Sequence, residues 1–228
     1  RINSAKTLGD YAFQGYTGAQ TVEVRHVETV QRTFSGMNIT KAIVEDVTTL
    51  GPQTFLNDAA LKELTISDVT YMENAFNGCK ALETATISDV DEIRNINAAT
   101  NLVLRDVGSV ANNGSAGNMV LQNLTLENVG SVAINTFSSC LRLQTLTAKG
   151  VTYIEAGAFT TTPLQSITLE DCGTVEPDAF RGCSKLTSLT LKGENGRIGY
   201  SECFDLSQPG FADLKARMEA IMEDTFTM

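Results

Sequence analysis

Residues 61–79 read LKELTISDVTYMENAFNGC, and residues 164–183 read LQSITLEDCGTVEPDAFRGC. Both stretches begin with apolar residues at the spacing L-x-x-L/I-x-I/L, and both end with Ala-Phe and then a Cys three positions after the Phe. Related segments return about every 21 residues along most of the chain, within the 20- to 29-residue range of short-period solenoids. The sequence therefore predicts one elongated body in which each repeat packs only against its neighbours.

Nine rungs align on a central pair of apolar residues separated by one intervening residue. The pairs are Val22/Val24, Ala42/Val44, Leu64/Ile66, Ala85/Ile87, Leu102/Leu104, Leu124/Leu126, Leu146/Ala148, Ile167/Leu169 and Leu189/Leu191. Alternation with a period of two is typical of a half-buried β-strand. Together with the L-x-x-L-x-L spacing, it predicts a leucine-rich repeat solenoid: a right-handed superhelix of the β/α type with a parallel β-sheet of about nine rungs.

A phenylalanine recurs at one position of most repeats. The positions are Phe13, Phe34, Phe55, Phe76, Phe137, Phe159 and Phe180. Seven exposed Phe side chains in a row would form a large apolar patch, so we expect them to be buried as a continuous spine. Residues 101–116 depart from this pattern and are rich in turn formers at their end, which predicts a thinner core and the least stable rungs there.

The two ends of the chain differ. Beyond the repeats, an apolar stripe at helical spacing predicts an amphipathic helix that caps the core. Its members are Phe211, Leu214, Met218, Ile221 and Met222. We therefore expect a solenoid over residues 1–204 and a C-terminal helical cap over 205–228. At the other end, Leu8 and Phe13 already occupy repeat positions with no polar cap before them, so we expect further residues, including a leader or anchor, upstream of Arg1.

Composition excludes several classes of partner. The chain has 17 basic and 27 acidic residues and a formal net charge of −10. Nucleic-acid binding needs a basic face that displaces counterions from phosphates, so this balance argues against it. It also argues against adsorption to anionic membranes. No apolar run approaches the roughly 20 residues that span a bilayer.

The residues that carry enzyme chemistry do not form a recognisable set. The five cysteines lack a CxxC pair, and four of them, Cys79, Cys140, Cys172 and Cys183, fall on repeat core positions, where Cys acts as a small apolar residue. The single histidine, His26, directly follows the first strand pair and has no pattern of a nucleophile and an orienting carboxylate around it. Phosphate-loop and HExxH motifs are absent from the sequence. We therefore predict no enzymatic activity, no metal and no cofactor.

The pattern I/V-x-x-x-A-F-x-x-C-x-x-L-x-x-L-x-L resembles the BspA-type leucine-rich repeat. It is carried by residues 72–87, 132–148 and 175–191. The resemblance implies a surface or secreted bacterial protein associated with adhesion to host proteins or to other cells. It carries over no catalytic residue, because the motif holds only structural positions. One departure is visible, since repeats of the family often have Pro just after the strand where this chain has Asp-Val, as at Asp68.

The outward-facing strand positions form our candidate binding face. Its residues are Arg25, Glu45, Thr65, Thr86, Arg105, Thr125, Glu127, Thr147, Lys149, Thr168, Glu170, Thr190 and Lys192. From Arg105 to Lys192 the charges alternate in sign, which places opposite charges on adjacent rungs and disfavours a register slip. The threonines have two interpretations, because β-branched residues suit a solvated strand and their hydroxyls also suit ligand hydrogen bonds.

Two hypotheses of function follow. The favoured one is a noncatalytic module, extracellular or at the cell surface, that binds an extracellular or host protein. A glycan is a less favoured partner, because the chain has no Trp and this face has no aromatic residue for stacking on a sugar. Tyr71 and Tyr153, outside the face, are candidate hot spots or half-buried framework residues. The alternative hypothesis is an intracellular leucine-rich repeat scaffold or enzyme inhibitor, with which five unpaired cysteines are compatible.

Overall fold

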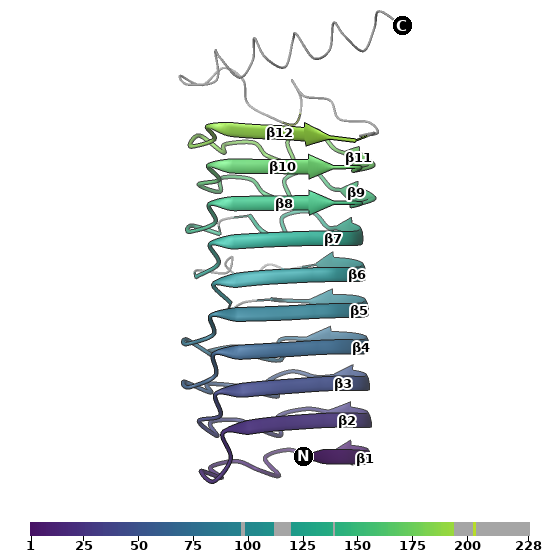
Figure 1. The fold of residues 1–228 in the computed structure, drawn as a ribbon, viewed down its shortest axis with the longest axis vertical. Helices are drawn as coiled ribbons and strands as arrows, with labels where there is room; N and C mark the ends of the chain where they lie inside the picture. The colour runs from purple at the N-terminus through teal and green to yellow at the C-terminus, as the bar shows by residue number, and fades with distance from the viewer. Residues whose placement is uncertain (97–98, 112–119, 139, 194–202, 204–228) are drawn as a thin grey trace, which may run out of the picture.

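Alternating apolar and polar residues give this chain a stack of parallel strands. The computed structural model describes residues 1–96, 99–111, 120–138, 140–193 and 203. Its strands are β1 (Ile2–Leu8), β2 (Thr21–Val30), β3 (Lys41–Leu50), β4 (Glu63–Glu73), β5 (Thr84–Arg94), β6 (Asn101–Ala111), β7 (Asn123–Val132), β8 (Thr145–Lys149), β9 (Tyr153–Ile154), β10 (Ser166–Glu170), β11 (Thr174–Val175) and β12 (Ser188–Lys192). Each strand lies beside the corresponding strand of the next repeat, so the described chain is a parallel β-solenoid (Figure 1).

Neighbouring strands are paired so that equivalent positions of successive repeats lie side by side, as the alignment of the apolar pairs predicts. Val44 faces Ile66, Ile66 faces Ile87, and Leu104 faces Leu126 across neighbouring strands. The strand order is β1-β2-β3-β4-β5-β6-β7-β8-β10-β12, and the short strands β9 and β11 continue the second half of β7. The predicted count of about nine rungs is corrected to about eight turns. The nine strands that carry the apolar pairs are β2 to β8, β10 and β12, and the chain makes eight returns between them.

A sharp corner divides each long strand into two halves. The residue at the corner has a positive φ in successive repeats. These residues are His26, Asp46, Asp68, Asp89, Asp106, Asn128, Gly150, Asp171 and Gly193. Asp and Asn enter this left-handed region more readily than most L-residues, and Gly enters it freely. Pro cannot, because its ring holds φ near −65°. The left-handed backbone at the corner therefore explains why this chain has Asp-Val at the place where repeats of the family often have Pro.

The corner gives a first testable expectation. We expect Asp89→Ala to lower the free energy of unfolding by about 1–2 kcal/mol, because Ala pays the left-handed penalty at φ 53° without a local side-chain hydrogen bond. Asp89→Gly is the matched control and should cost less, because Gly has no Cβ. Urea unfolding of both variants measures the difference, and equal losses would contradict a backbone origin.

The return segments between strands are turns, and the prediction of a β/α-type repeat is wrong for the described residues. Among them the structure has strands but no helix. The backbone N–H groups of these segments donate to the next turn of the solenoid, as from Phe34 to Thr54 O (2.8 Å) and from Phe159 to Ala179 O (2.8 Å). Such bonds between turns replace the bonds within a helix. The predicted capping helix, 205–228, lies outside the described residues, and the right hand of the superhelix stays a prediction.

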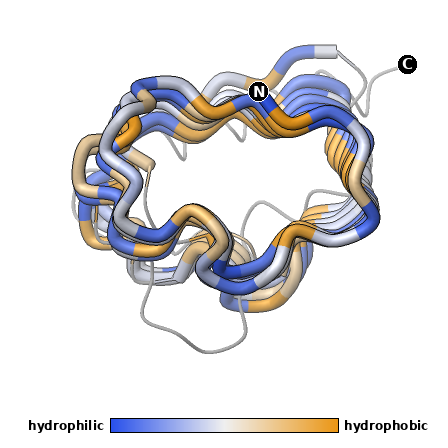
Figure 2. The backbone as a smooth tube through the Cα atoms, turned by 90° about the horizontal axis from the view of Figure 1, so that it is seen from below, coloured by the Kyte–Doolittle hydropathy of each residue, from blue (hydrophilic) through white to orange (hydrophobic). Residues whose placement is uncertain are grey.

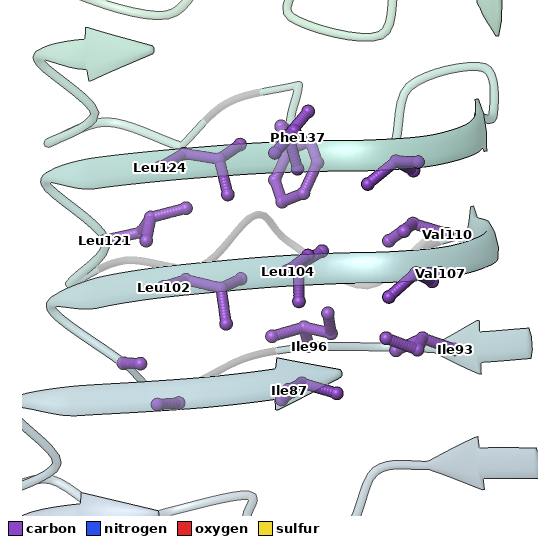
Figure 3. Packing of buried hydrophobic residues seen from close by; sticks show 14 of the residues in the cluster. Ile87, Ile93, Ile96, Leu102, Leu104, Val107, Val110, Leu121, Leu124 and Phe137 are labelled. Carbon is purple, nitrogen blue, oxygen red and sulfur yellow. The ribbon is translucent and has the colours of Figure 1, made fainter. Parts of the chain in front are cut away.

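One apolar core runs along the solenoid axis. Seen along that axis, the turns superpose as a closed loop, and residues of similar hydropathy align from turn to turn (Figure 2). Figure 3 shows the packing between β5 and β7, where Leu102, Leu104, Val107 and Val110 are at most 1% exposed. The described part of the predicted irregular stretch thus retains a buried core. The remainder of that stretch, residues 112–116, lies outside the described residues.

The predicted burial of the phenylalanines is confirmed for six of the seven, and Phe13, at the end of the array, is 36% exposed. Phe34 stacks on Phe13 and Phe55 with ring centroids 5.5 and 5.4 Å apart. Phe159 stacks on its neighbours at 5.3 and 5.2 Å. Between these two groups, Phe76 and Ile96 take the same repeat position and are 2% and 4% exposed. The equivalent position of the next turn, near Ala116, lies outside the described residues.

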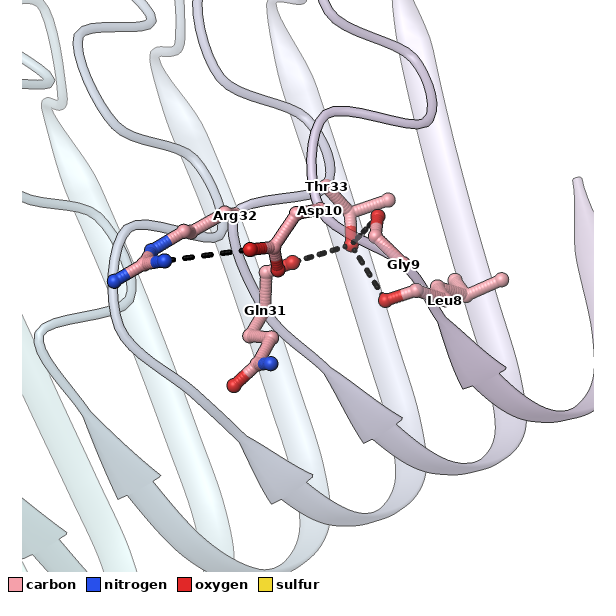
Figure 4. A network of polar contacts seen from close by, with 6 residues as sticks. All are labelled: Leu8, Gly9, Asp10, Gln31, Arg32 and Thr33. Atoms are coloured by element: carbon pink, nitrogen blue, oxygen red, sulfur yellow. Dashed lines mark hydrogen bonds and ion pairs between the residues drawn. The ribbon is translucent and has the colours of Figure 1, made fainter.

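Polar side chains tie successive turns together around this spine. The Thr33 hydroxyl lies 2.9 Å from the carbonyl oxygen of Gln31 and 3.2 Å from that of Leu8, one turn earlier (Figure 4). Thr54 and Thr136 make the same pair of contacts in their own turns. These threonines replace the Ala of the Ala-Phe motif, and each is at most 2% exposed. Each buried hydroxyl thereby has hydrogen-bond acceptors in the core, on carbonyl groups of two successive turns.

The structural interpretation of the cysteines is confirmed. All five are buried and unpaired with one another. Cys79 Sγ lies 2.9 Å from the carbonyl oxygen of Phe55, one turn earlier. Burial raises the pKa of the Cys79 thiol to about 12. A thiol that is inaccessible and protonated at neutral pH is chemically inert, so Cys79 acts as a core residue.

Candidate binding face

The thirteen residues predicted as a binding face lie together on one face of the sheet. We define the sheet face as the outward-pointing side chains of the strand halves that precede the corner, in β2 to β8, β10 and β12. Register places Thr125, Thr147, Thr168 and Thr190 in one column. The charged residues form a second column beside it, and members of both columns are exposed or half-exposed. The register therefore places these residues on one continuous face of the sheet. The role of that face in binding stays a prediction.

Ion pairs join adjacent strands along the charged column. Arg25 pairs with Glu45, Arg105 Nε lies 2.5 Å from Glu127 Oε2, and Lys149 Nζ lies 2.5 Å from Glu170 Oε1. The hydrogen bond with Glu170 raises the pKa of Lys149, and the same bond lowers the pKa of Glu170. Both groups therefore stay charged near neutral pH. The face carries many charges, but a partner would meet most of them already neutralised.

A shallow hollow of about 300 Å³ interrupts the sheet face over β4 and β5. It is lined by Glu63, Leu64, Thr65, Thr84 and Thr86. Sequence reasoning included two of these threonines but did not single out the hollow. One feature of the sequence could have indicated a depression at this place. Ser67 and Ser88 are short and stand in the column that elsewhere holds long charged side chains.

Tyr71 and Tyr153 belong to the framework of the neighbouring face, beyond the corner. The Tyr71 hydroxyl donates to Glu73 Oε2 at 2.9 Å, and the Tyr153 hydroxyl donates to Glu176 Oε1. Both rings are half-buried. Burial, followed by the bond with Glu73, raises the pKa of Tyr71, and the bond with Glu176 raises that of Tyr153. These bonds hold both tyrosines in the framework, and a role for either ring as a hot spot stays a prediction.

A second hollow, of about 250 Å³, opens at the N-terminal end of the core. Its lining includes Ile2, Phe13, Val22 and Phe34. Phe13 is 36% exposed, and the nearby Tyr16 is 57% exposed. This end of the solenoid therefore presents apolar core surface, as expected where no polar cap covers the first described turn.

The residues weighed for chemistry in the sequence lie apart, because the cysteines are buried in the core and His26 is at the surface. His26 lies at an exposed corner, with Nδ1 2.5 Å from Asp46 Oδ2. Within the described part of the chain, no group of three His, Cys, Asp or Glu side chains could hold a metal ion. Over the same residues, no helix has the length and hydropathy needed to cross a membrane.

The repeat geometry agrees with a family comparison. A family model described as "BspA type Leucine rich repeat region" matches residues 2–100 and 112–228, in six copies. The chain belongs to the BspA-type leucine-rich repeat family. The recurring spacing of the motif in this chain is the spacing of strand, corner and phenylalanine in most turns of the solenoid. The resemblance inferred from the sequence is thereby confirmed.

A solved structure is also similar in part. It is the crystal structure of a leucine rich cell surface protein from Faecalibacterium prausnitzii A2-165, 13% identical, with a TM-score of 0.36. The match covers 80% of this chain and 84% of that chain. Among curated proteins, no sequence matches this chain significantly.

Proposed function

We propose that this BspA-type solenoid is a noncatalytic binding module, at the cell surface or secreted, that recognises another protein through its sheet face. The observation that carries the proposal is the continuity of that face across nine strands in unbroken register. With about 4.8 Å between strands and about 3.3 Å per residue over the five residues of each strand half, three of which point outward, the face measures about 40 by 17 Å. Its area, roughly 700 Å², is close to the roughly 800 Å² that each partner contributes to a standard protein interface.

The chemistry of the face also favours a protein partner. A protein surface can lie flat on the sheet and exchange hydrogen bonds with its threonine hydroxyls. The cross-strand ion pairs hold the long side chains in place, so less side-chain entropy is lost on binding. The bacterial surface location belongs to the same proposal and rests on the family. Fractionation of cells that produce the natural gene product tests it, and recovery only from the cytoplasm would contradict it.

A pair of substitutions in one turn tests the face directly. Thr147 is exposed near the middle of the threonine column, and Thr152 is exposed beyond the corner. We expect Thr147→Arg to abolish or weaken binding at least about tenfold to any protein captured from a panel of extracellular and host surface proteins, because a large charged side chain would prevent close packing. Surface plasmon resonance measures the change.

Thr152→Arg is the matched control, since it adds the same charge to the same turn on a different face. Its binding should equal that of the unsubstituted protein. Equal loss in both variants would contradict the sheet face as the site, and loss in Thr152→Arg alone would place the site beyond the corner.

A further inference from the structure

The hollow over β4 and β5 lies between strands β3 and β6, which flank these two strands in the sheet (Figure 1). Its outward-pointing lining residues form two cross-strand pairs, Glu63/Thr84 and Thr65/Thr86. The next outward pair along the two strands, Ser67/Ser88, lies directly beside it. On one side, β3 supplies Lys41, Ile43 and Glu45, and on the other side β6 supplies Asn101, Val103 and Arg105. The depression exists because the threonines and serines are shorter than the charged side chains around them.

The hollow and the serine pair beside it offer hydroxyl groups that make no hydrogen bond within the described part of the protein. Thr65, Thr84, Thr86, Ser67 and Ser88 have no side-chain hydrogen bond to any described residue. By contrast, the outward-facing Asn123 and Thr145 are bonded to one another at 2.6 Å. Each free hydroxyl can donate one hydrogen bond and accept two. Five such groups on two adjacent strands match a ligand that both donates and accepts at several neighbouring points.

The charges around the hollow select against an anionic ligand. Arg105 is engaged by Glu127 and Glu45 by Arg25, so both strong charges on the flanking strands are paired with the strand farther from the hollow. At the rim, Glu63 Oε2 lies 3.0 Å from Lys41 Nζ, and the Glu63 side chain remains 61% exposed. The exposed corner residues Asp68 and Asp89 follow the two serines and have no ion pair among the described residues.

We infer that this hollow binds a neutral saccharide unit. Hydroxyl groups of the sugar would exchange hydrogen bonds with the threonine and serine hydroxyls, and two neighbouring sugar hydroxyls would donate to the Glu63 carboxylate. Ile43 and Val103 flank Thr65 and Thr86 in the same column, and their apolar side chains suit the C–H surface of the sugar ring. Without an aromatic platform the affinity is weak, in the millimolar range. This site goes beyond the proposed protein partner and does not depend on it.

Titration with simple sugars tests the inference. Isotope-labelled protein would be titrated with methyl glycosides of neutral hexoses and with N-acetylglucosamine, to about 50 mM, well above a millimolar dissociation constant. We expect amide shifts confined to β4, β5 and the flanking strands for at least one neutral sugar. A methyl glucuronide should bind more weakly, because its carboxylate approaches Glu63 and the corner aspartates, and Glu63→Gln should reduce that discrimination.

Isosteric variants separate the hollow from the rest of the face. Thr86→Val removes one hydroxyl of the hollow and keeps a β-branched side chain, so the strand is retained; we expect the dissociation constant to rise roughly three- to tenfold. Thr168→Val makes the same change in the same column on β10 and should leave sugar binding unchanged. Absence of shifts with every sugar, or equal weakening in both variants, would overturn the inference. Neither result bears on protein binding, which Thr147→Arg tests separately.

Discussion

Phe159→Ala is expected to lower the free energy of unfolding by about 3–5 kcal/mol, the range for removing a fully buried aromatic side chain. Phe159 is 0% exposed and stacks on Phe137 and Phe180, so its removal leaves a cavity and breaks two ring contacts. In a solenoid each turn is stabilised mainly by its neighbours. The loss at Phe159 should therefore also reduce the cooperativity of unfolding, because the turns on either side become partly uncoupled.

Phe13→Ala is the control for this effect. Phe13 occupies the same repeat position and stacks on Phe34, but it is 36% exposed at the end of the array. Its substitution should cost much less and leave the cooperativity of unfolding intact. Urea unfolding followed by circular dichroism measures both quantities, and similar losses for the two variants would show that the spine does not depend on burial between two turns.

The second large effect is expected at Asp58, a carboxylate in the core. It takes the position three residues after the repeat Phe, where Cys79 and Cys183 lie in other turns. Asp58 is 0% exposed, and its carboxylate accepts hydrogen bonds from the backbone N–H of Ile39 (3.2 Å) and of Ala60 (3.4 Å). We expect Asp58→Ala to lower the free energy of unfolding by about 1–3 kcal/mol, because buried N–H donors lose their acceptor. Thermal unfolding measures the loss.

The same residue predicts a pH dependence of stability. Burial raises the pKa of Asp58 above 3.8, although the backbone N–H groups act in the opposite direction. The folded state therefore holds this proton more tightly than the unfolded chain, and the contribution of Asp58 to stability is lost as pH rises through its folded pKa. Relative to Asp58→Asn, which does not titrate, the unsubstituted protein should lose stability as pH rises from about 4. A difference that stays constant with pH would contradict this assignment.

Patterns that repeat in every turn could be predicted from the sequence. The apolar pairs at Leu64/Ile66 and Leu102/Leu104 predict strands in register, and the recurring Phe predicts a buried spine, because each signal is repeated at the same position. The alternating charges predicted neighbouring opposite charges, and the ion pair between Arg105 and Glu127 confirms that arrangement. Local patterns sufficed here because contacts in a solenoid are made between equivalent positions of adjacent turns.

Features that depend on backbone conformation could not be predicted in the same way. A return segment of about ten residues fits either a short helix or a turn, and the structure has turns because their N–H groups bond to the next turn. The role of Asp at the corner also required φ angles, since the sequence alone shows only that Asp89 precedes Val90. Asp58 looks like a surface residue in the sequence, and only the packing of Ile39 beside it shows a buried acceptor.

The sequence by itself determined that this chain is a BspA-type repeat with a parallel sheet, a buried phenylalanine spine and one polar face. Each of these depends on residue type and spacing alone, and each recurs in most repeats. Only the tertiary structure decided where that face is hollowed. The hollow over β4 and β5 lies where Glu63, Thr65, Thr84 and Thr86 meet, between the longer side chains of Lys41 on β3 and Arg105 on β6. Its shape depends on side chains from four strands that become neighbours only when the repeats stack.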